Sequence, residues 1–254
     1  MRIVVALGGN ALLDVDDAIF TFRNGRVAKY LAKRAATVVC GNAYLAERFS
    51  EWNSRIHVIP TAVDTERYRP AGPGDKKRGL IVGWIGTSGN LRELNAIEGS
   101  IAKAISACPG AKLRVVSDAL PVVRSLSAEQ FEFLQWSEAD EVSAIQGMDI
   151  GIMPLRDSVW TRGKCAFKMI QYMACGLPSV VSPVGMNAEV LALGDFSLSA
   201  QSDGQWTEAI VALIRGADMR RNMGVLARQV AERTFSVKVL APRLAAAIRE
   251  AADV

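Results

Sequence analysis

Short runs of β-branched and other apolar residues alternate along the chain with longer segments whose apolar positions recur at helical spacing. The apolar runs predict strands, and the amphipathic segments predict helices. The expected strands cover residues 2–7, 37–40, 55–60, 80–86, 112–118, 131–136, 149–154, 178–182 and 196–200. Because strands that alternate with helices form parallel sheets covered on both faces, the pattern predicts an α/β fold.

The expected helices cover residues 26–36, 43–52, 91–108, a stretch near 138–146, a stretch from Lys164 to Cys175 and three segments between Gln205 and Ala252. Residues 61–79 interrupt the alternation: they are polar, contain proline and glycine, and show no periodicity, which indicates a linker. We therefore expect a small α/β portion over residues 1–70 and a Rossmann-like, doubly wound parallel sheet over residues 71–254. Sheets of the second kind bind ligands at the carboxyl ends of their strands.

Composition narrows the classes of function. Half of the 254 residues are hydrophobic, so the chain can bury a substantial core, and no apolar run reaches the ~18 residues of a spanning helix. A net charge of +4 is too small to indicate nucleic acid as a partner, but it suits an anionic small ligand or weak contact with a membrane surface. The four cysteines form no CxxC pair, so no metal site is expected, and reduced cysteines favour a cytoplasmic protein.

The stretch GWIGTSGNL, residues 83–91, places a glycine-rich turn between a strand and a helix. Glycine lets the backbone approach a ligand closely, and the free N–H groups of a first helical turn attract anions. This combination predicts a phosphate cradle formed by Gly86, Thr87, Ser88, Gly89 and Asn90. The alternative is an ordinary strand-to-helix loop in which Ser88 or Asn90 caps the helix.

The stretch KCAFKMIQYMAC, residues 164–175, predicts a helix with one polar and one apolar face. Residues three and four apart share a helical face, which groups Lys164, Lys168 and Gln171 into a polar stripe. A cation near a helix N-terminus opposes the helix dipole, so an anionic partner such as a diphosphate would explain Lys164. Gln171, one turn further on, would then bind sugar hydroxyls. The alternative is a charged face that is only solvated.

The stretch ACGLPSVVSPVG reads as a helix that ends at Gly176, a sharp turn and a buried strand. The residues that follow this strand lie at its carboxyl end, where sheets of this class bind ligands. The candidate ligand-binding residues there are Ser182, Gly185, Met186 and Asn187.

Three stretches together resemble a known family: VIPTAVDTERYRP, GWIGTSGN and GKCAFKMIQYMACGLPSVVSPVGMNAEV. Their order and spacing resemble the nucleotide-sugar half of GT-B glycosyltransferases, glycosyltransferase family 4, over roughly residues 14–250. The resemblance implies two facing Rossmann-like domains, of which the C-terminal one holds a nucleoside-diphosphate sugar, and a last helix that crosses back toward the N-terminal part. It also implies sugar transfer with retention of configuration and without a metal or other cofactor.

By this resemblance, the donor diphosphate is expected at Gly86–Asn90 together with Lys164 or Lys168. The donor ribose and sugar are expected at Gln171, Gly185, Met186 and Asn187. The family's paired glutamates lie eight residues apart, and this sequence has Gly163 and Gln171 at those positions, so the site loses both carboxylates. No catalytic residue is assigned, because the only histidine, His57, lies in a strand pattern and is expected to be structural.

The N-terminus departs from the family. The first thirteen residues, MRIVVALGGNALL, resemble the start of a carbamate kinase, whereas DVDDAIF resembles a segment well inside the acceptor domain of the glycosyltransferases. The N-terminal portion is therefore expected to be an incomplete acceptor domain with an unrelated strand joined on. We expect a glycosyltransferase that acts on a saccharide or lipid-linked acceptor. The alternatives are a nucleotide-sugar-binding fragment without turnover and, less well supported, an NAD-binding protein, since GWIGTSGN does not match GxGxxG.

The sequence contains two charged clusters, and each has two interpretations. Asp14, Asp16 and Asp17 suggest metal ligands, but no later ligand run follows, and helix capping or solvent exposure fits better. A basic cluster on and around the helix at 26–36 is either a solvated face or a face that rests on anionic lipid, which would make the protein peripheral to a membrane. Its members are Arg23, Arg26, Lys29, Lys33 and Arg34.

Overall fold

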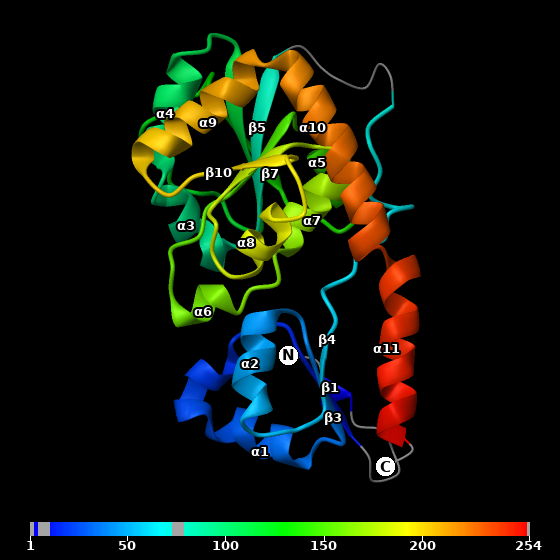
Figure 1. Cartoon of the computed structure of the whole chain (residues 1–254). Helices are drawn as coiled ribbons and strands as arrows, with labels where there is room; N and C mark the ends of the chain where they lie inside the picture. Colours follow the sequence, from blue (N-terminus) through cyan, green and yellow to red (C-terminus); the bar gives the residue numbers. More distant parts are fainter. Residues whose placement is uncertain (1–2, 5–10, 73–78, 253–254) are drawn as a thin grey trace.

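The computed structural model describes residues 3–4, 11–72 and 79–252 and folds them into two separate sheets (Figure 1). The four-stranded sheet has the order β1-β2-β3-β4, and the six-stranded sheet has the order β10-β9-β8-β5-β6-β7. In Figure 1 the smaller sheet lies below the larger one. No strand among the described residues belongs to both sheets, as the linker expected at residues 61–79 predicts.

The smaller sheet comprises β1 (Ile3–Val4), β2 (Leu12–Val15), β3 (Thr37–Cys40) and β4 (Ile56–Val58). β1 pairs antiparallel with β2, whereas β2, β3 and β4 are parallel to one another. The connecting helices are η1 (Ile19–Gly25), α1 (Arg26–Arg34) and α2 (Ala43–Ser50). α2 begins after Asn42 because the Asn42 side chain accepts a hydrogen bond from the Leu45 N–H at 2.8 Å.

The larger sheet comprises β5 (Leu80–Ile85), β6 (Ala111–Ser117), β7 (Phe131–Gln135), β8 (Ile150–Met153), β9 (Ser179–Val181) and β10 (Ser197–Ser199), all parallel. The helices between them are η2 (Ser88–Asn90), α3 (Leu91–Asn95), α4 (Glu98–Ser106), α5 (Glu141–Gln146), α6 (Val159–Arg162), α7 (Phe167–Ala174) and α8 (Met186–Leu191). From β5 the chain winds outward to β6 and β7, then returns to β8 and winds the other way. This order confirms the doubly wound, Rossmann-like sheet and places its switch point between β5 and β8.

The C-terminal helices connect the two halves. α9 (Asp203–Arg215) and α10 (Ala217–Val230) pack on the larger half, and η3 (Ala231–Phe235) leads into α11 (Val237–Ala252). α11 returns beside the smaller sheet (Figure 1), as the resemblance implies, and forms a buried cluster with it. The members of that cluster are Leu12, Val39, Ile59, Leu240, Ala247 and Ala251. α11, which follows the expected boundary at residue 70, thus packs on the portion that precedes it. The boundary itself stays a prediction.

Two helices differ from expectation. The helix expected to begin at Lys164 begins at Phe167, because Ala166 has a left-handed backbone (φ 53°) that interrupts any helix before it. The helix expected over 91–108 is divided into α3 and α4, since Ile97 leaves the helical conformation (φ −115°, ψ 10°) while its side chain is buried. No helix in the described ranges combines the length and the apolar character needed to cross a membrane.

The N-terminal strands also differ from expectation. Of the strand expected at residues 2–7, Ile3–Val4 is found, and the remaining residues lie outside the described ones. The sequence pattern did not predict β2, although Leu12–Val15 pairs with β3 along its whole length. β2 spans the position after Leu13 at which the resemblance changes, so the two dissimilar segments form one strand.

Candidate functional site

A cavity of about 690 Å³ lies between the two halves of the molecule. This volume falls within the range of small-molecule binding sites. Its lining comes from the smaller sheet, from the residues that precede and begin α7, and from α11. The charged residues in the lining are Asp14, Asp16, Asp17, Lys164 and Lys168.

The N-terminal end of α7 opens into this cavity, where Ala166, Phe167 and Lys168 form part of the lining. The first N–H groups of a helix have no partner within the helix. No side chain of the described residues caps α7, because the N-cap position is occupied by alanine. These N–H groups and the helix dipole therefore favour an anion at this point of the cavity.

Lys168 lies on the first turn of α7 and packs against the glycine-rich turn. A Cβ atom at Gly86 would stand 2.6 Å from Cε of Lys168, so glycine at this position leaves room for the lysine stem, whereas Gly89 faces open space. The Lys168 ammonium lies 5.8 Å from the centroid of the Trp84 indole, within cation–π range. Burial and then repulsion by Lys164 lower the pKa of Lys168 to about 8. An anionic ligand would relieve both effects.

Lys164 reaches the same cavity from the loop before α7, not from the helix itself. Its Nζ lies 3.7 Å from Oδ1 of Asp17 and 5.3 Å from the centroid of the Trp160 ring. Burial raises the pKa of Asp17, and the neighbouring Lys164 opposes this rise. The two lysines therefore line one cavity, and their assignment to the donor diphosphate stays a prediction. The expected helical stripe is wrong, because Lys164 precedes α7.

The acidic cluster shows no metal geometry. Within the described residues, no group of three or more His, Cys, Asp or Glu side chains is arranged to hold a metal ion. Asp17 pairs with Lys164, and Asp16 is exposed. His57 lies in β4, where a strand was expected, and its Nε2 is 3.0 Å from the carboxylate of Glu250 on α11, outside the cavity lining.

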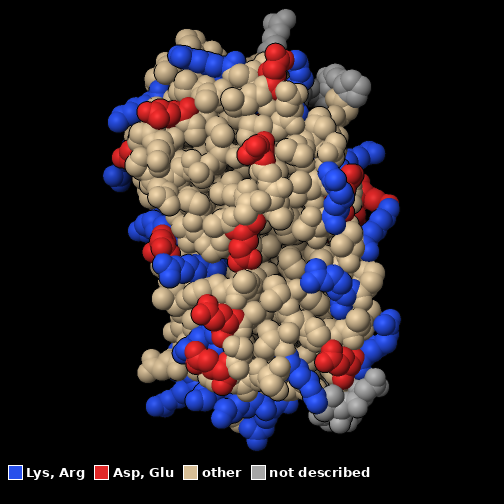
Figure 2. Space-filling model, in the orientation of Figure 1, with Lys and Arg blue, Asp and Glu red and all other residues tan. Residues whose placement is uncertain are grey.

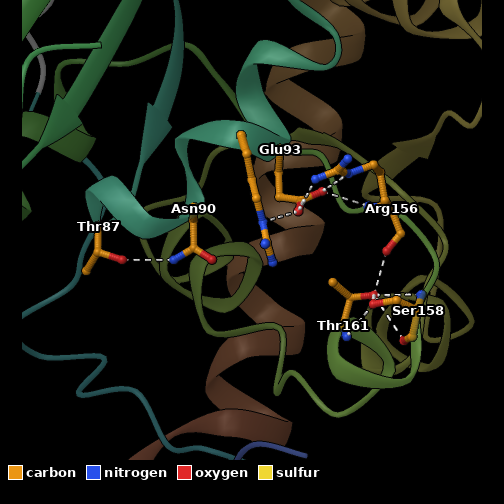
Figure 3. A network of polar contacts seen from close by, with 7 residues as sticks. Thr87, Asn90, Glu93, Arg156, Ser158 and Thr161 are labelled. Atoms are coloured by element: carbon orange, nitrogen blue, oxygen red, sulfur yellow. Dashed lines mark hydrogen bonds and ion pairs between the residues drawn. The ribbon is translucent and has the colours of Figure 1, made fainter. Parts of the chain in front are cut away.

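The glycine-rich turn is bonded to a carboxylate of the protein itself. The Ser88 backbone N–H donates to Asp118 at 2.5 Å, and the Ser88 hydroxyl donates to the same side chain at 3.0 Å. These hydrogen bonds hold the pKa of Asp118 below its ordinary value. The Asn90 amide donates to Thr87 Oγ1 at 2.9 Å (Figure 3), and neither Ser88 nor Asn90 caps a helix with its side chain. Ser88 therefore binds a carboxylate of the protein. The turn residues Gly86–Asn90 lie outside the cavity lining, and their assignment to the donor diphosphate stays a prediction.

A buried carboxylate that the sequence analysis did not single out holds the loop after β8 in place (Figure 3). Glu93 is 4% exposed and accepts hydrogen bonds from the Arg156 backbone at 3.0 Å, from Arg156 Nε at 3.3 Å and from Arg92 Nε at 3.1 Å. Burial raises the pKa of Glu93, but the hydrogen bonds from Arg156 outweigh it and leave the pKa below its ordinary value. No sequence pattern marks this pair, because Glu93 and Arg156 lie 63 positions apart.

The same loop packs against the smaller half of the molecule. The Asn42 side chain, which caps α2, also donates to the carbonyl groups of Arg162 at 3.3 Å and of Lys164 at 3.1 Å. The rings of Phe22 and Trp160 meet edge to face with centroids 5.2 Å apart. These contacts hold the loop against the smaller half and fix the backbone that carries Lys164.

Position 163 is part of this contact. A Cβ atom at Gly163 would stand 2.7 Å from both the backbone nitrogen and the Cβ of Ala18. The resemblance implies a glutamate at this position in the family. In this chain Ala18 of the N-terminal part occupies the space that such a side chain would need, so the glycine is a requirement of the packing.

Gln171 lies outside the lining of the cavity. It is 3% exposed, and its Nε2 donates to the Tyr68 hydroxyl at 3.1 Å and to the Glu141 carboxylate. Glu141 also accepts from Tyr68 at 2.6 Å and from the Trp136 indole at 2.9 Å. Gln171 lies about one helical turn beyond Lys168 along α7. Its hydrogen bonds connect Tyr68 of the linker with Glu141 of α5. Its assignment to the donor ribose stays a prediction.

The residues after β9 are closely packed. Gly185 has a positive φ of 54°, and a Cβ atom there would stand 2.5 Å from the Arg162 carbonyl oxygen. Met186 and Asn187 are buried, and the Asn187 amide donates to the Ser182 carbonyl at 3.0 Å. The Asn187 Oδ1 atom has no hydrogen-bond partner among the described residues. Their assignment to the donor sugar is likewise a prediction.

Two facing α/β sheets, one doubly wound, with a cavity between them define the GT-B class of fold. A profile of the family described as glycosyl transferases group 1 matches residues 80–216, which is just over half of the 254-residue chain. The chain therefore belongs to this family, which confirms the resemblance found in the sequence and identifies a glycosyltransferase with a nucleotide-sugar-binding fold.

Solved structures agree on the fold. HepE from Anabaena superposes with a TM-score of 0.78 at 17% identity, covering 94% of this chain and 71% of HepE. Sucrose-phosphate synthase from Thermosynechococcus elongatus superposes with a TM-score of 0.66 at 16% identity, covering 88% of this chain and 60% of the synthase. WaaG, a glycosyltransferase of lipopolysaccharide biosynthesis, superposes with a TM-score of 0.63 at 14% identity, covering 83% of this chain and 61% of WaaG. No curated protein gives a significant match.

Proposed function

We propose that this chain transfers a sugar from a nucleoside-diphosphate sugar to an acceptor hydroxyl with retention of configuration, and that the donor diphosphate binds in the cavity at the start of α7. One observation carries the proposal: an uncapped helix N-terminus and two lysines converge on one cavity. Similarity to HepE, whose structures contain UDP or UDP-glucose, supports a nucleotide sugar as the donor. The acceptor belongs to the saccharides or to lipid-linked sugars.

In this proposal the diphosphate contacts Lys164, Lys168 and the turn Gly86–Asn90. Lys168 forms no ion pair with a described residue, so it is available to an anion at once, whereas Lys164 must be shared with Asp17. At Ser88 a phosphate oxygen would replace the carboxylate of Asp118. The donor ribose and sugar are assigned to Gln171, Gly185, Met186 and Asn187. No cofactor is proposed, because the lysines and the helix end supply the positive charge.

The residues of the cavity act by electrostatic preorganisation. When the bond between the anomeric carbon and the diphosphate breaks, negative charge grows on the leaving group. Lys164, Lys168 and the N–H groups of α7 are fixed before the reaction, so they stabilise this charge without reorganising. The network around Glu93 and the contacts of Asn42 hold the loop that carries Lys164 in that position.

A second candidate function is nucleotide-sugar binding without turnover. The observation that favours it is Gly163, because the space for the family's first carboxylate is taken by Ala18. In this case the donor binds as proposed, but no sugar reaches an acceptor.

The test of the donor site is calorimetric titration of the whole chain with UDP, GDP and ADP. UDP is the first choice because of the likeness to HepE. Lys168→Ala should weaken binding of the best nucleotide by about 1–3 kcal/mol, the contribution of a charge-assisted hydrogen bond. The matched control is Lys103→Ala, which removes an exposed lysine of α4 on the larger half and should leave the affinity unchanged.

Turnover distinguishes the two candidates. Nucleotide release from UDP-glucose in the presence of saccharide and lipid-linked acceptors supports transfer, while binding without release supports the second function. Equal affinities in the wild type, Lys164→Ala and Lys168→Ala would remove the site assignment altogether.

A further inference from the structure

One stretch of the chain is strongly charged with a single sign. Between Ala18 and Ala46 the sequence contains five cations and no aspartate or glutamate. The cations are Arg23, Arg26, Lys29, Lys33 and Arg34. All five are exposed, and none forms an ion pair with another residue in the part of the chain that the structure describes. Solvated helix faces usually mix both signs of charge. A segment with cations alone therefore indicates an anionic binding partner.

The structure collects these cations on one face. Ala28 and Ala32 of α1 are buried against the rest of the smaller half, which turns the opposite side of the helix to solvent. Arg26, Lys29 and Lys33 follow one another at helical spacing on that side. Figure 2 shows blue side chains gathered at the lower end of the molecule, where Figure 1 places α1. We call this surface, formed by η1 and α1, the basic face.

Large apolar side chains lie among the cations. Phe22 is 59% exposed, Tyr30 55% and Val27 47%. Beside Phe22 the backbone is left-handed at Arg23 and Asn24, with φ of 48° and 55°, an arrangement that costs energy in residues other than glycine. Cations combined with exposed aromatic and aliphatic side chains match the chemistry of a bilayer interface, with its anionic headgroups and apolar acyl boundary.

We propose that the basic face docks on the surface of a membrane that contains anionic lipid. Charge complementarity selects this occupant, and the apolar residues favour it over a purely polyanionic partner, because acyl chains provide a place for Phe22 and Val27. The inference concerns a surface outside the donor cavity and holds whether or not the donor site is assigned correctly.

The basic face is linked to the cavity through a short series of contacts. Phe22 meets Trp160 edge to face, and the ammonium of Lys164, which lines the cavity, lies over the same Trp160 ring. Docking of Phe22 at the headgroups would therefore act on a ring that is also in contact with Lys164.

The experiment is sedimentation of the whole chain, without nucleotide, with vesicles of phosphatidylcholine alone or mixed with phosphatidylglycerol. We expect binding to the mixed vesicles, little binding to the neutral ones, and weakening by salt. The triple variant Arg26→Gln, Lys29→Gln, Lys33→Gln should bind about a hundredfold more weakly, since each cation near an anionic surface contributes about a factor of five. The control Lys103→Gln, Lys112→Gln, Arg124→Gln removes the same charge from exposed positions on the larger half and should bind like the wild type.

The apolar part has its own test. Phe22→Ser with Tyr30→Ser should reduce the binding that persists in high salt, whereas Leu120→Ser with Val122→Ser, which changes exposed residues elsewhere, should not. Equal binding to neutral and anionic vesicles, or equal losses in the two triple variants, would overturn the proposal. So would salt-sensitive binding to a duplex oligonucleotide without binding to vesicles.

Discussion

The two halves of the molecule differ in how they obtain their cores. The larger sheet has a buried cluster drawn entirely from its own half, from Val82 to Met223. The smaller sheet has no such cluster among the described residues: its buried side chains belong either to a cluster shared with the larger half, including α7 and η3, or to one shared with α11. Phe49, for example, belongs to the cluster that contains Met169 and Phe235.

This difference explains where the cavity lies. The larger half has a core of its own beneath a parallel sheet, and its loops lie at the carboxyl ends of the strands. The smaller half buries part of its surface by packing against those loops. The contacts that stabilise the smaller sheet, such as Asn42 with the loop before α7, are the same contacts that position Lys164. Stability of the smaller half and geometry of the donor site are therefore expected to change together.

The largest expected effect comes from Leu240, through which α11 packs on the smaller sheet. Leu240→Ala should lower the free energy of unfolding by about 2–5 kcal/mol, because Leu240 is 2% exposed and its removal leaves a cavity. Val239→Ala, at the 38% exposed neighbour, is the control and should cost less than about 0.5 kcal/mol. Urea denaturation measures both.

Hydrogen exchange locates the Leu240 effect. Amide protection should fall in β2, β3 and β4 while the strands of the larger sheet stay protected. A uniform loss of protection over both sheets would contradict the difference between the two halves.

The next effect tests the contact at Gly163. Gly163→Glu, which brings back a family carboxylate, should destabilise the protein by about 1–3 kcal/mol, because its Cβ would press on the backbone of Ala18. Gly99→Glu is the control, since a Cβ atom there meets nothing within 4 Å. If Gly163→Glu is as stable as the wild type and binds UDP-glucose more tightly, the loop moves away from Ala18 and the closed arrangement is not obligatory.

The pH dependence of UDP affinity tests whether Lys168 contacts the diphosphate. Burial lowers the pKa of Lys168 to about 8, so the lysine is charged below that pH and loses its proton as the pH rises through it. Affinity for UDP should therefore fall about tenfold between about pH 7 and about pH 9. Lys168→Arg stays charged and should remove most of this fall. An affinity that is independent of pH in the wild type would show that Lys168 does not contact the diphosphate.

Deprotonation of Lys168 should weaken UDP binding as the pH rises, but it should increase the stability of the folded chain. Between about pH 8 and about pH 10.4 the unfolded chain keeps a proton on Lys168 that the folded chain has lost. Because the unfolded state then binds more protons, the contribution of Lys168 to the free energy of unfolding should rise with pH in this window. Comparing the pH profiles of the wild type and Lys168→Met in urea denaturation isolates the effect.

The smallest expected effect concerns the ion pair between the halves. Asp17→Asn should change stability by less than about 1 kcal/mol, because Asp17 and Lys164 are partly exposed. It should also strengthen UDP binding a few-fold, since Lys164 no longer has a competing carboxylate. Asp16→Asn, which alters the exposed neighbour, is the control for the loss of a negative charge. Weaker binding by Asp17→Asn would indicate that Asp17 itself contacts the ligand.

Much of the site could be predicted because its elements are local. The glycine-rich turn follows β5, and the residues from Ser182 to Asn187 follow β9, as the apolar runs and their turn residues indicate. The prediction that Lys164 shares a helical stripe with Lys168 and Gln171 was wrong, because the left-handed backbone at Ala166 cannot be predicted from a pattern of apolar residues. Gln171 was placed on the correct helix but not in its network, since its partner Tyr68 lies 103 positions away.

By itself the sequence determined the alternation of strands and helices, the parallel doubly wound sheet and the family, because each depends on periodicity or on contiguous motifs. Only the tertiary structure decided which distant polar side chains meet. Sheet order and loop packing bring together Lys164 and Asp17 in the cavity and, outside it, Glu93 with Arg156 and Ser88 with Asp118. Hydrophobic periodicity specifies which face of an element is buried, but it carries no information about which distant polar group will meet it.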